Sequence, residues 1–202
     1  MIDMWEFEQK HYNAGHKWIC GVDEAGRGPL AGPVCAAAVI LPAYIEIPGL
    51  NDSKKLSDKK RRELFPLICE KSIAYGIAFA DHREIDEINI LQATYLAMER
   101  AISQLSQKPD IALIDGNRAK DFGIPVETVV GGDGRSASIA AASVLAKVTR
   151  DDYMLELSKT YPEYGFEIHK GYGTKAHYAA LAKHGPCEIH RMTFLKKLYG
   201  TK

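Results

Sequence analysis

The chain has 202 residues, of which 46% are hydrophobic, and its 26 Lys and Arg residues balance 26 Asp and Glu residues. This composition excludes an intrinsically disordered chain, whereas a neutral total neither requires nor excludes a nucleic-acid partner. The longest apolar stretch, residues 34–41, is too short to span a bilayer, and the N-terminus lacks a signal-peptide pattern. Four cysteines without a C-x-x-C pair favour free thiols over a zinc site. We therefore expect a cytoplasmic protein that does not contact a membrane.

Two strands and a capped helix are predicted in the first third of the chain. A helical lead-in before about residue 16 precedes a strand over 18–22, which ends where two carboxylates begin. A second strand over 34–41 is close enough in sequence to pair with the first in antiparallel fashion. Ser57 is a typical N-cap, so a helix should follow it to about residue 69.

Strands and helices alternate over the rest of the chain. In chain order we expect strand 73–80, helix 90–105, strand 111–114, strand 126–130, helix 136–159, and helices 175–184 and 193–199. This pattern predicts an α/β fold with a mixed sheet flanked by helices. We expect a single domain over residues 1–202, with residues from about 160 to 202 as a C-terminal helical extension.

Carboxylates follow three of the predicted strands, each within two residues of a glycine. Asp23 and Glu24 follow the first strand, Asp115 follows the strand over 111–114, and Asp133 lies soon after the strand over 126–130. Ligands gather at the carboxyl ends of strands in α/β sheets, so neighbouring strands would bring the four carboxylates together. Taken singly, Asp115 and Asp133 can also be read as turn residues, because aspartate beside glycine is common in turns.

Four converging carboxylates repel one another unless a cation neutralises them. Oxygen ligands suit Mg²⁺ or Mn²⁺ and disfavour zinc. Two such ions about 3.5–4 Å apart are a known arrangement for in-line phosphoryl displacement. The sequence therefore predicts a Mg²⁺ or Mn²⁺ site, with two ions expected when substrate is bound.

A glycine-flanked arginine comes directly after the first two carboxylates. Arg27 lies between Gly26 and Gly28, and glycines let a backbone approach a ligand closely. Amide N–H groups of such a turn can bond a phosphate or a sugar hydroxyl. The simpler interpretation is a tight turn.

Two further segments, considered together with this turn, indicate nucleic-acid binding. Lys54 and Lys55 lie on a loop, and Tyr172 lies between two glycines, where an exposed ring could stack on a sugar or base. Paired lysines are usually a solvated surface, and Tyr172 could instead pack locally. The histidines show no metal spacing with cysteine, which favours surface or packing roles for them.

Six ordered motifs resemble those of the ribonuclease HII family, over residues 18–194. They are GVDEAGRGPLAGP at 21–33, DSKKL at 52–56, IDGN at 114–117, GD at 132–133, SIAAASVLAKVTRD at 138–151 and HKGYGT at 169–174. The resemblance implies an RNase H-like fold that hydrolyses RNA in RNA–DNA hybrids. It also implies nicking of duplex DNA on the 5′ side of an embedded ribonucleotide, leaving 5′-phosphate and 3′-hydroxyl ends.

The resemblance also implies roles for individual residues. The expected metal ligands and catalytic residues are Asp23, Glu24, Asp115 and Asp133. The expected substrate contacts are Gly26, Arg27 and Gly28 at the 2′-hydroxyl, Tyr172 on the following sugar, Lys54 and Lys55 on the backbone, and Asn117. One departure is Gly131, where the family often has lysine, and this puts one cationic contact in doubt.

Three other interpretations stay open. A ribonuclease HIII-like nuclease would carry a further N-terminal domain and a Gly-Lys-Gly turn. A junction-resolving nuclease of the same fold would use clustered acids without sensing a 2′-hydroxyl. A non-catalytic phosphate-binding module would leave Asp115 and Asp133 unexplained. We expect the chain to act as a monomer.

Overall fold

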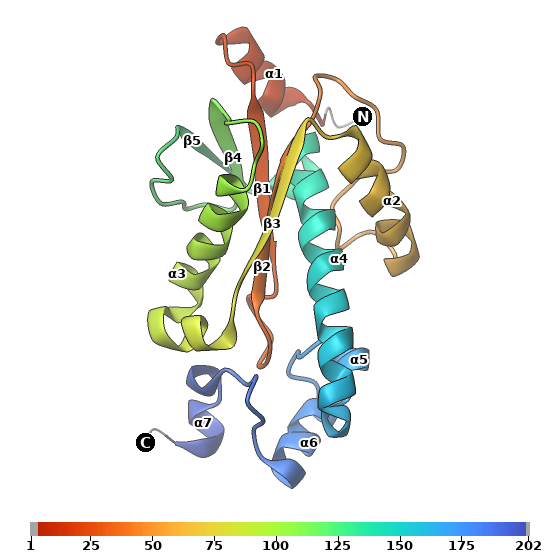
Figure 1. Cartoon of the computed structure of the whole chain (residues 1–202), viewed down its shortest axis with the longest axis vertical. Helices are drawn as coiled ribbons and strands as arrows, with labels where there is room; N and C mark the ends of the chain where they lie inside the picture. The colour runs from red at the N-terminus through yellow and green to blue at the C-terminus, as the bar shows by residue number, and fades with distance from the viewer. Residues whose placement is uncertain (1–3, 201–202) are drawn as a thin grey trace.

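A five-stranded mixed sheet forms the centre of the molecule (Figure 1). The computed structural model describes residues 4–200. The strands are β1 Ile19–Ala25, β2 Val34–Ile40, β3 Ala74–Ala80, β4 Ile111–Asp115 and β5 Val126–Val129, in the spatial order β3-β2-β1-β4-β5. Strand β2 is antiparallel to β1 and β3, whereas β4 is parallel to both of its neighbours, β1 and β5. The mixed sheet and the antiparallel β1–β2 pair are therefore confirmed.

Helices cover both faces of this sheet. The α-helices are α1 Glu6–Asn13, α2 Asp58–Lys71, α3 His82–Ser103, α4 Ala137–Thr160, α5 Phe166–His169, α6 Lys175–His184 and α7 Lys196–Tyr199. The short 3-10 helices are η1 Gly132–Gly134, η2 Pro162–Tyr164 and η3 Met192–Phe194. Helix α3 lies on one face, α4 and α2 lie on the other, and α5, α6 and α7 lie beyond one end of the sheet (Figure 1). No helix within residues 4–200 is both long and apolar enough to cross a membrane.

Strand β1 extends further than the sequence predicts. It continues through Asp23 and Glu24 because its pairing with β2 runs on to Ala25, opposite Cys35. The expectation that the strand ends before the two acids is therefore wrong. Successive side chains of a strand point to opposite faces, so Asp23 and Glu24 face opposite sides of the sheet.

Gly21, in the middle of β1, lets helix α4 lie unusually close to the sheet. A Cβ at this position would be 2.1 Å from the carbonyl carbon of Ser138. Alanines 140–142 and 146 of α4 are fully buried, as expected for a helix that packs closely on a sheet. The distance between β1 and the start of α4 is therefore fixed by backbone contact.

Helix α3 starts earlier than residue 90, where the apolar spacing places it. Asp81 caps the helix at its N-terminus and forms a reciprocal capping box with Glu84. The helix is kinked at Asn89, which has φ 66°, and the Asn89 Oδ1 atom then accepts the N–H groups of Leu91 and Gln92. The sequence therefore predicted the second segment of α3 and missed the first, because the cap at Asp81 was not recognised.

The segment between α6 and α7 pairs with the connection between β1 and β2. The Gly32 N–H donates to the Ile189 carbonyl at 2.9 Å, and the Arg191 N–H donates to the Leu30 carbonyl at 2.8 Å. A core of its own packs here, built from Leu30, Ala31, Met154, Tyr164, Phe166, Leu181, Ile189 and Leu195. The C-terminal helices are therefore anchored next to the turn that follows β1.

Candidate metal centre

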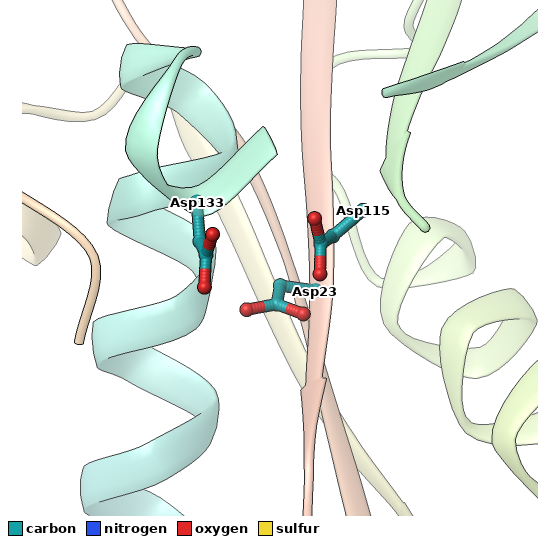
Figure 2. A group of neighbouring side chains, drawn as sticks. All are labelled: Asp23, Asp115 and Asp133. Carbon is teal, nitrogen blue, oxygen red and sulfur yellow. The ribbon is translucent and has the colours of Figure 1, made fainter. Parts of the chain in front are cut away.

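Three carboxylates converge at the edge of the sheet where β1, β4 and η1 meet. Oxygen atoms of Asp23, Asp115 and Asp133 all lie within 4.8 Å of one another (Figure 2). Figure 2 shows the three side chains pointing toward a common space from three separate segments. The structure thus brings together three of the four acids that the sequence singles out.

The parallel order of β1, β4 and β5 explains this convergence. Asp115 is the last residue of β4, and the chain leaves β5 through Gly131, with φ 65°, into η1, which carries Asp133. The Gly132 N–H donates to the Asp115 Oδ1 atom at 2.7 Å and so joins the two segments. A left-handed residue at 131 favours glycine over lysine, which is consistent with the departure at this position.

The carboxylates carry more negative charge than nearby cations offset. Asp23 is only 3% exposed, and burial, followed by the charges of Glu24 and Asp115, raises its pKa well above the usual range. Burial and the charge of Asp133 raise the pKa of Asp115, although the Gly132 N–H opposes this. The three carboxylates together form a site whose charge a hard divalent cation would neutralise.

Lys54 supplies the one ammonium group that contacts this cluster among the described residues. Its Nζ atom is 3.0 Å from the Asp133 Oδ2 atom. Burial acts to lower the pKa of Lys54, but the hydrogen bond to Asp133 and the charge of Asp23 raise it overall. The Lys54 ammonium therefore offsets part of the negative charge of the three carboxylates. Lys55 lies elsewhere, with its Nζ atom 3.7 Å from the Asp52 Oδ2 atom.

Glu24 approaches from the other face of the sheet and is not one of the three converging acids. Its Oε1 atom is 3.3 Å from the Arg27 Nη1 atom. Burial raises the pKa of Glu24, whereas Arg27 acts to lower it. Glu24, Asp115 and Asn117 line a cavity of about 250 Å³ against helix α3. Glu24 is thus next to the cluster, and its role as a ligand stays a prediction.

Two fully buried arginines fix the turn that follows β1. The Arg191 Nη2 and Nη1 atoms donate to the carbonyls of Gly26, at 2.6 Å, and Arg27, at 2.9 Å. The Arg150 Nε atom donates to the Pro33 carbonyl at 3.1 Å, and a Cβ at Gly26 would be 1.9 Å from the same Nε atom. Neither arginine was singled out from the sequence, because nothing in its local spacing distinguishes a buried arginine from an exposed one.

The turn keeps hydrogen-bond donors available. Within residues 4–200, the N–H groups of Arg27 and Gly28 donate to no protein acceptor. The Arg27 side chain is half exposed. Free backbone donors beside a cation are suited to a phosphate or a hydroxyl group.

Tyr172 lies directly beside this turn. A Cβ at Gly28 would be 3.7 Å from the Tyr172 Cε1 atom, and the tyrosine is 42% exposed. The Lys147 ammonium and the Arg150 guanidinium lie 6.0 and 5.8 Å from the ring centroid. The structure therefore places an exposed ring next to the Gly26–Gly28 turn, although the two are more than 140 residues apart in sequence.

Comparison with known proteins identifies the family. The family model for ribonuclease HII matches residues 20–197. A ribonuclease HII of Endomicrobium trichonymphae is 58% identical over 194 residues, which cover 95% of this chain and 92% of the relative.

Two solved structures share the fold. The ribonuclease H2 of Pyrococcus horikoshii OT3 has a TM-score of 0.72 and 26% identity, covering 88% of this chain and 93% of the other. The ribonuclease HII in the PCNA:RNase HII complex from Archaeoglobus fulgidus has a TM-score of 0.73 and 26% identity, covering 87% and 94%. The expected RNase H-like architecture is confirmed, and the chain belongs to the ribonuclease HII family of type 2 ribonuclease H endoribonucleases.

Proposed function

We propose that this enzyme nicks duplex DNA on the 5′ side of an embedded ribonucleotide and cleaves RNA in RNA–DNA hybrids, leaving 5′-phosphate and 3′-hydroxyl ends. The observation that carries this proposal is the juxtaposition of three elements. The converging carboxylates lie on β1, β4 and η1, the Gly26–Gly28 turn directly follows β1, and Tyr172 lies beside Gly28. A reactive phosphate and the sugar that marks it can therefore be bound together.

The choice between RNA and DNA at one sugar must depend on the 2′-hydroxyl. The unused N–H groups of Arg27 and Gly28 are the groups that would bond it, since Arg191 holds the turn's carbonyls on the protein side. Tyr172 would stack on the sugar that follows, and its exposed ring allows this.

Other residues would contact the nucleic acid away from this sugar. Lys54 and Lys55, both largely exposed, would contact the sugar-phosphate backbone of the substrate with little sequence preference. Asn117 would contact the substrate beside Asp115.

The carboxylate cluster fits divalent ions. Asp23, Asp115 and Asp133 would hold them together with Glu24, and we expect two Mg²⁺ or Mn²⁺ ions in the substrate complex. Bound in this way, such ions supply activation of the attacking water and stabilisation of the leaving 3′-oxygen. The protein's own contribution is to seat the scissile phosphate by holding the adjacent ribose at the Gly26–Gly28 turn. We further propose that the chain acts as a monomer in the cytoplasm.

The decisive experiment uses a DNA duplex with a single ribonucleotide, in Mg²⁺ or Mn²⁺, with and without a chelator. We expect nicking that the chelator abolishes and that Asp23→Asn reduces by roughly 1000-fold, as for loss of a group essential to the chemistry. Asp110→Asn is the matched control, because Asp110 only accepts the N–H groups of Lys17 and Trp18. Cleavage retained by Asp23→Asn would overturn the metal assignment, and cutting of all-DNA junctions instead would indicate a resolvase.

A second experiment tests the role of the ring. Tyr172→Ala should lower cleavage at a single ribonucleotide by about 10-fold or more, because a stacking contact contributes about 1–3 kcal/mol. Tyr75→Ala, at a similarly exposed tyrosine of β3, should leave the rate unchanged. Equal rates for both variants would show that Tyr172 does not stack on substrate.

A further inference from the structure

Three imidazole rings are buried under the loop that carries Tyr172. His169 ends α5, His177 lies in α6, and His190 lies on the segment that pairs with the β1–β2 connection. They are 8%, 0% and 1% exposed, respectively, and the rings of His169 and His177 are stacked with centroids 4.6 Å apart. The function proposed above assigns none of them a role.

In their neutral forms, two of these rings are best satisfied by one arrangement of protons, although the Cys187 Sγ and carbonyl oxygen atoms also lie 3.1 and 3.3 Å from the His190 Nδ1 atom. The Cys187 N–H donates to the His190 Nδ1 atom at 2.9 Å, so Nδ1 is an acceptor and the proton of neutral His190 is on Nε2. That Nε2–H faces the His177 Nε2 atom at 3.0 Å, which must accept. The proton of neutral His177 is therefore on Nδ1, which donates to the Tyr172 carbonyl at 3.0 Å.

This arrangement requires both rings to be neutral, and their surroundings favour that state. Burial lowers the pKa of His177, with the neighbouring His169 adding to the effect. Burial and the proximity of His177 lower the pKa of His190 to about 4.

The hydrogen bond to the Tyr172 carbonyl completes the support of the loop. The same carbonyl accepts the Thr174 N–H at 2.8 Å, and the Gly171 N–H donates to the His169 Nδ1 atom at 3.2 Å. The Gly171 carbonyl accepts the Leu30 N–H at 2.8 Å, from the connection after β1. The loop backbone is thus bound on both sides of Tyr172, while its ring stays exposed beside Gly28.

We propose that His177 and His190 are positioning residues, which set the Tyr172 ring beside the Gly26–Gly28 turn through an ordered chain of hydrogen bonds from Cys187 N–H to Tyr172 carbonyl. This inference rests on the proposed stacking role of Tyr172. These hydrogen bonds begin at the backbone of Cys187 and end at the backbone of Tyr172. They would fix the place of the Tyr172 ring relative to residue 187, and neither imidazole would touch the substrate.

The proton arrangement can be observed directly. Long-range ¹H–¹⁵N NMR correlations of the imidazoles at neutral pH should show His190 protonated only at Nε2 and His177 only at Nδ1. The opposite tautomer at either ring, or a doubly protonated ring, would overturn the proposed chain. This measurement is independent of any cleavage assay.

Substitutions at His177 test whether the chain of hydrogen bonds affects cleavage. His177→Asn keeps a side-chain N–H near the position of Nδ1, whereas His177→Leu removes the donor at similar volume. On the duplex with one ribonucleotide we expect kcat/KM to fall about 10- to 100-fold in His177→Leu, the cost of a misplaced binding group, and only about 3-fold in His177→Asn. His184→Leu, at an exposed histidine of the same helix, is the control and should be unchanged.

A double-mutant comparison separates positioning from general damage to the fold. In a Tyr172→Ala background, His177→Leu should cost little further activity, because the ring it positions is gone. An equal loss in both backgrounds would show a merely structural role and overturn the inference. If Tyr172→Ala itself cleaves normally, the function proposed for the ring is wrong. If Tyr172→Ala is impaired and His177→Leu is not, the proposed function stands and the inference is wrong.

Discussion

Two buried polar regions lie on either side of the Gly26–Gly28 turn, and they are built in opposite ways. In the C-terminal polar network, formed by His169, His177, Cys187, His190 and Arg191, donors and acceptors meet within the protein. In the carboxylate cluster, formed by Asp23, Asp115 and Asp133, acceptors converge and share one lysine.

The difference separates two uses of buried polarity. A satisfied network orders the backbone around it, and its removal costs stability. A cluster of like charges destabilises the protein that carries it until a ligand of opposite charge binds. Stability measurements should therefore respond in opposite directions when the two regions are changed.

The largest loss of stability is expected from the network. Arg191→Met removes the donors to the Gly26, Arg27 and Gly32 carbonyls, and buried groups left unbonded should lower the free energy of unfolding by about 3 kcal/mol. Urea denaturation measures this. Arg62→Met, which breaks exposed bridges to Asp58 and Asp152, should cost less than about 1 kcal/mol. If Arg191→Met and Arg62→Met lower the free energy of unfolding equally, the buried network stabilises the protein no more than exposed ion pairs do.

A gain of stability is expected when the cluster binds its ligand. Mg²⁺ or Mn²⁺ at about 100 times its dissociation constant should raise the free energy of unfolding by about 2.7 kcal/mol. NaCl at matched ionic strength controls for screening. Asp115→Asn should lose most of the gain, and an unchanged gain in that variant would place the bound ion elsewhere.

A smaller gain is expected from Asp23→Asn without divalent ions. The raised pKa of Asp23 means that its ionised form disfavours the folded state, so a neutral amide should raise Tm by about 2–4 °C for each 1 kcal/mol of relieved repulsion. The gap should close as pH falls and Asp23 of the wild type becomes protonated. Asp110→Asn is the opposite case, because backbone N–H bonds lower the pKa of Asp110, and it should destabilise the protein above the unfolded pKa. A Tm for Asp23→Asn below that of the wild type would contradict the picture of an uncompensated cluster.

The smallest change in stability is expected from Lys54→Gln. The side chain is 73% exposed, and such ion pairs contribute about 0–1 kcal/mol. Binding should respond more clearly, with weaker affinity for duplex and a salt dependence reduced by about one charge. Lys55→Gln, whose ammonium lies at Asp52, should change affinity in the same direction. If Lys54→Gln leaves the affinity of the carboxylate cluster for Mg²⁺ unchanged, the Lys54 ammonium does not compete with the ion.

The sequence predicted the elements of the sheet and three of the converging acids, because both depend on local patterns. Strand ends, glycines and N-caps are read from neighbouring residues, and Ser57 and Ser136 do cap α2 and α4. The extension of β1 through Asp23 and Glu24 depends instead on its pairing with β2, which no local pattern reports. Strand alternation turns the Glu24 side chain to the opposite face from Asp23, and the grouping of Glu24 with the other acids as a metal ligand stays a prediction.

Buried polar side chains were the main omission. Histidines 177 and 190 are buried, as the packing interpretation has it, but the sequence does not indicate that they bond each other from 13 positions apart. Arg150 and Arg191 bind backbone carbonyls that lie more than 100 positions away. Partners of this kind are set by tertiary packing, so the sequence alone gives no spacing from which to predict them.

Helix α1 is joined to the start of α4, which is distant in the sequence, through the carboxylate of Glu8. The Glu8 Oε1 atom accepts hydrogen bonds from Ser136 Oγ and from the N–H and Oγ of Ser138, at 2.7–2.9 Å, where α4 begins. These bonds join residues 128 and 130 positions apart, just beyond Asp133. During synthesis on the ribosome, the first helix must wait until about two thirds of the chain has emerged before its partner exists. The contact between α1 and the start of α4 can therefore form only late in synthesis, once both segments have emerged.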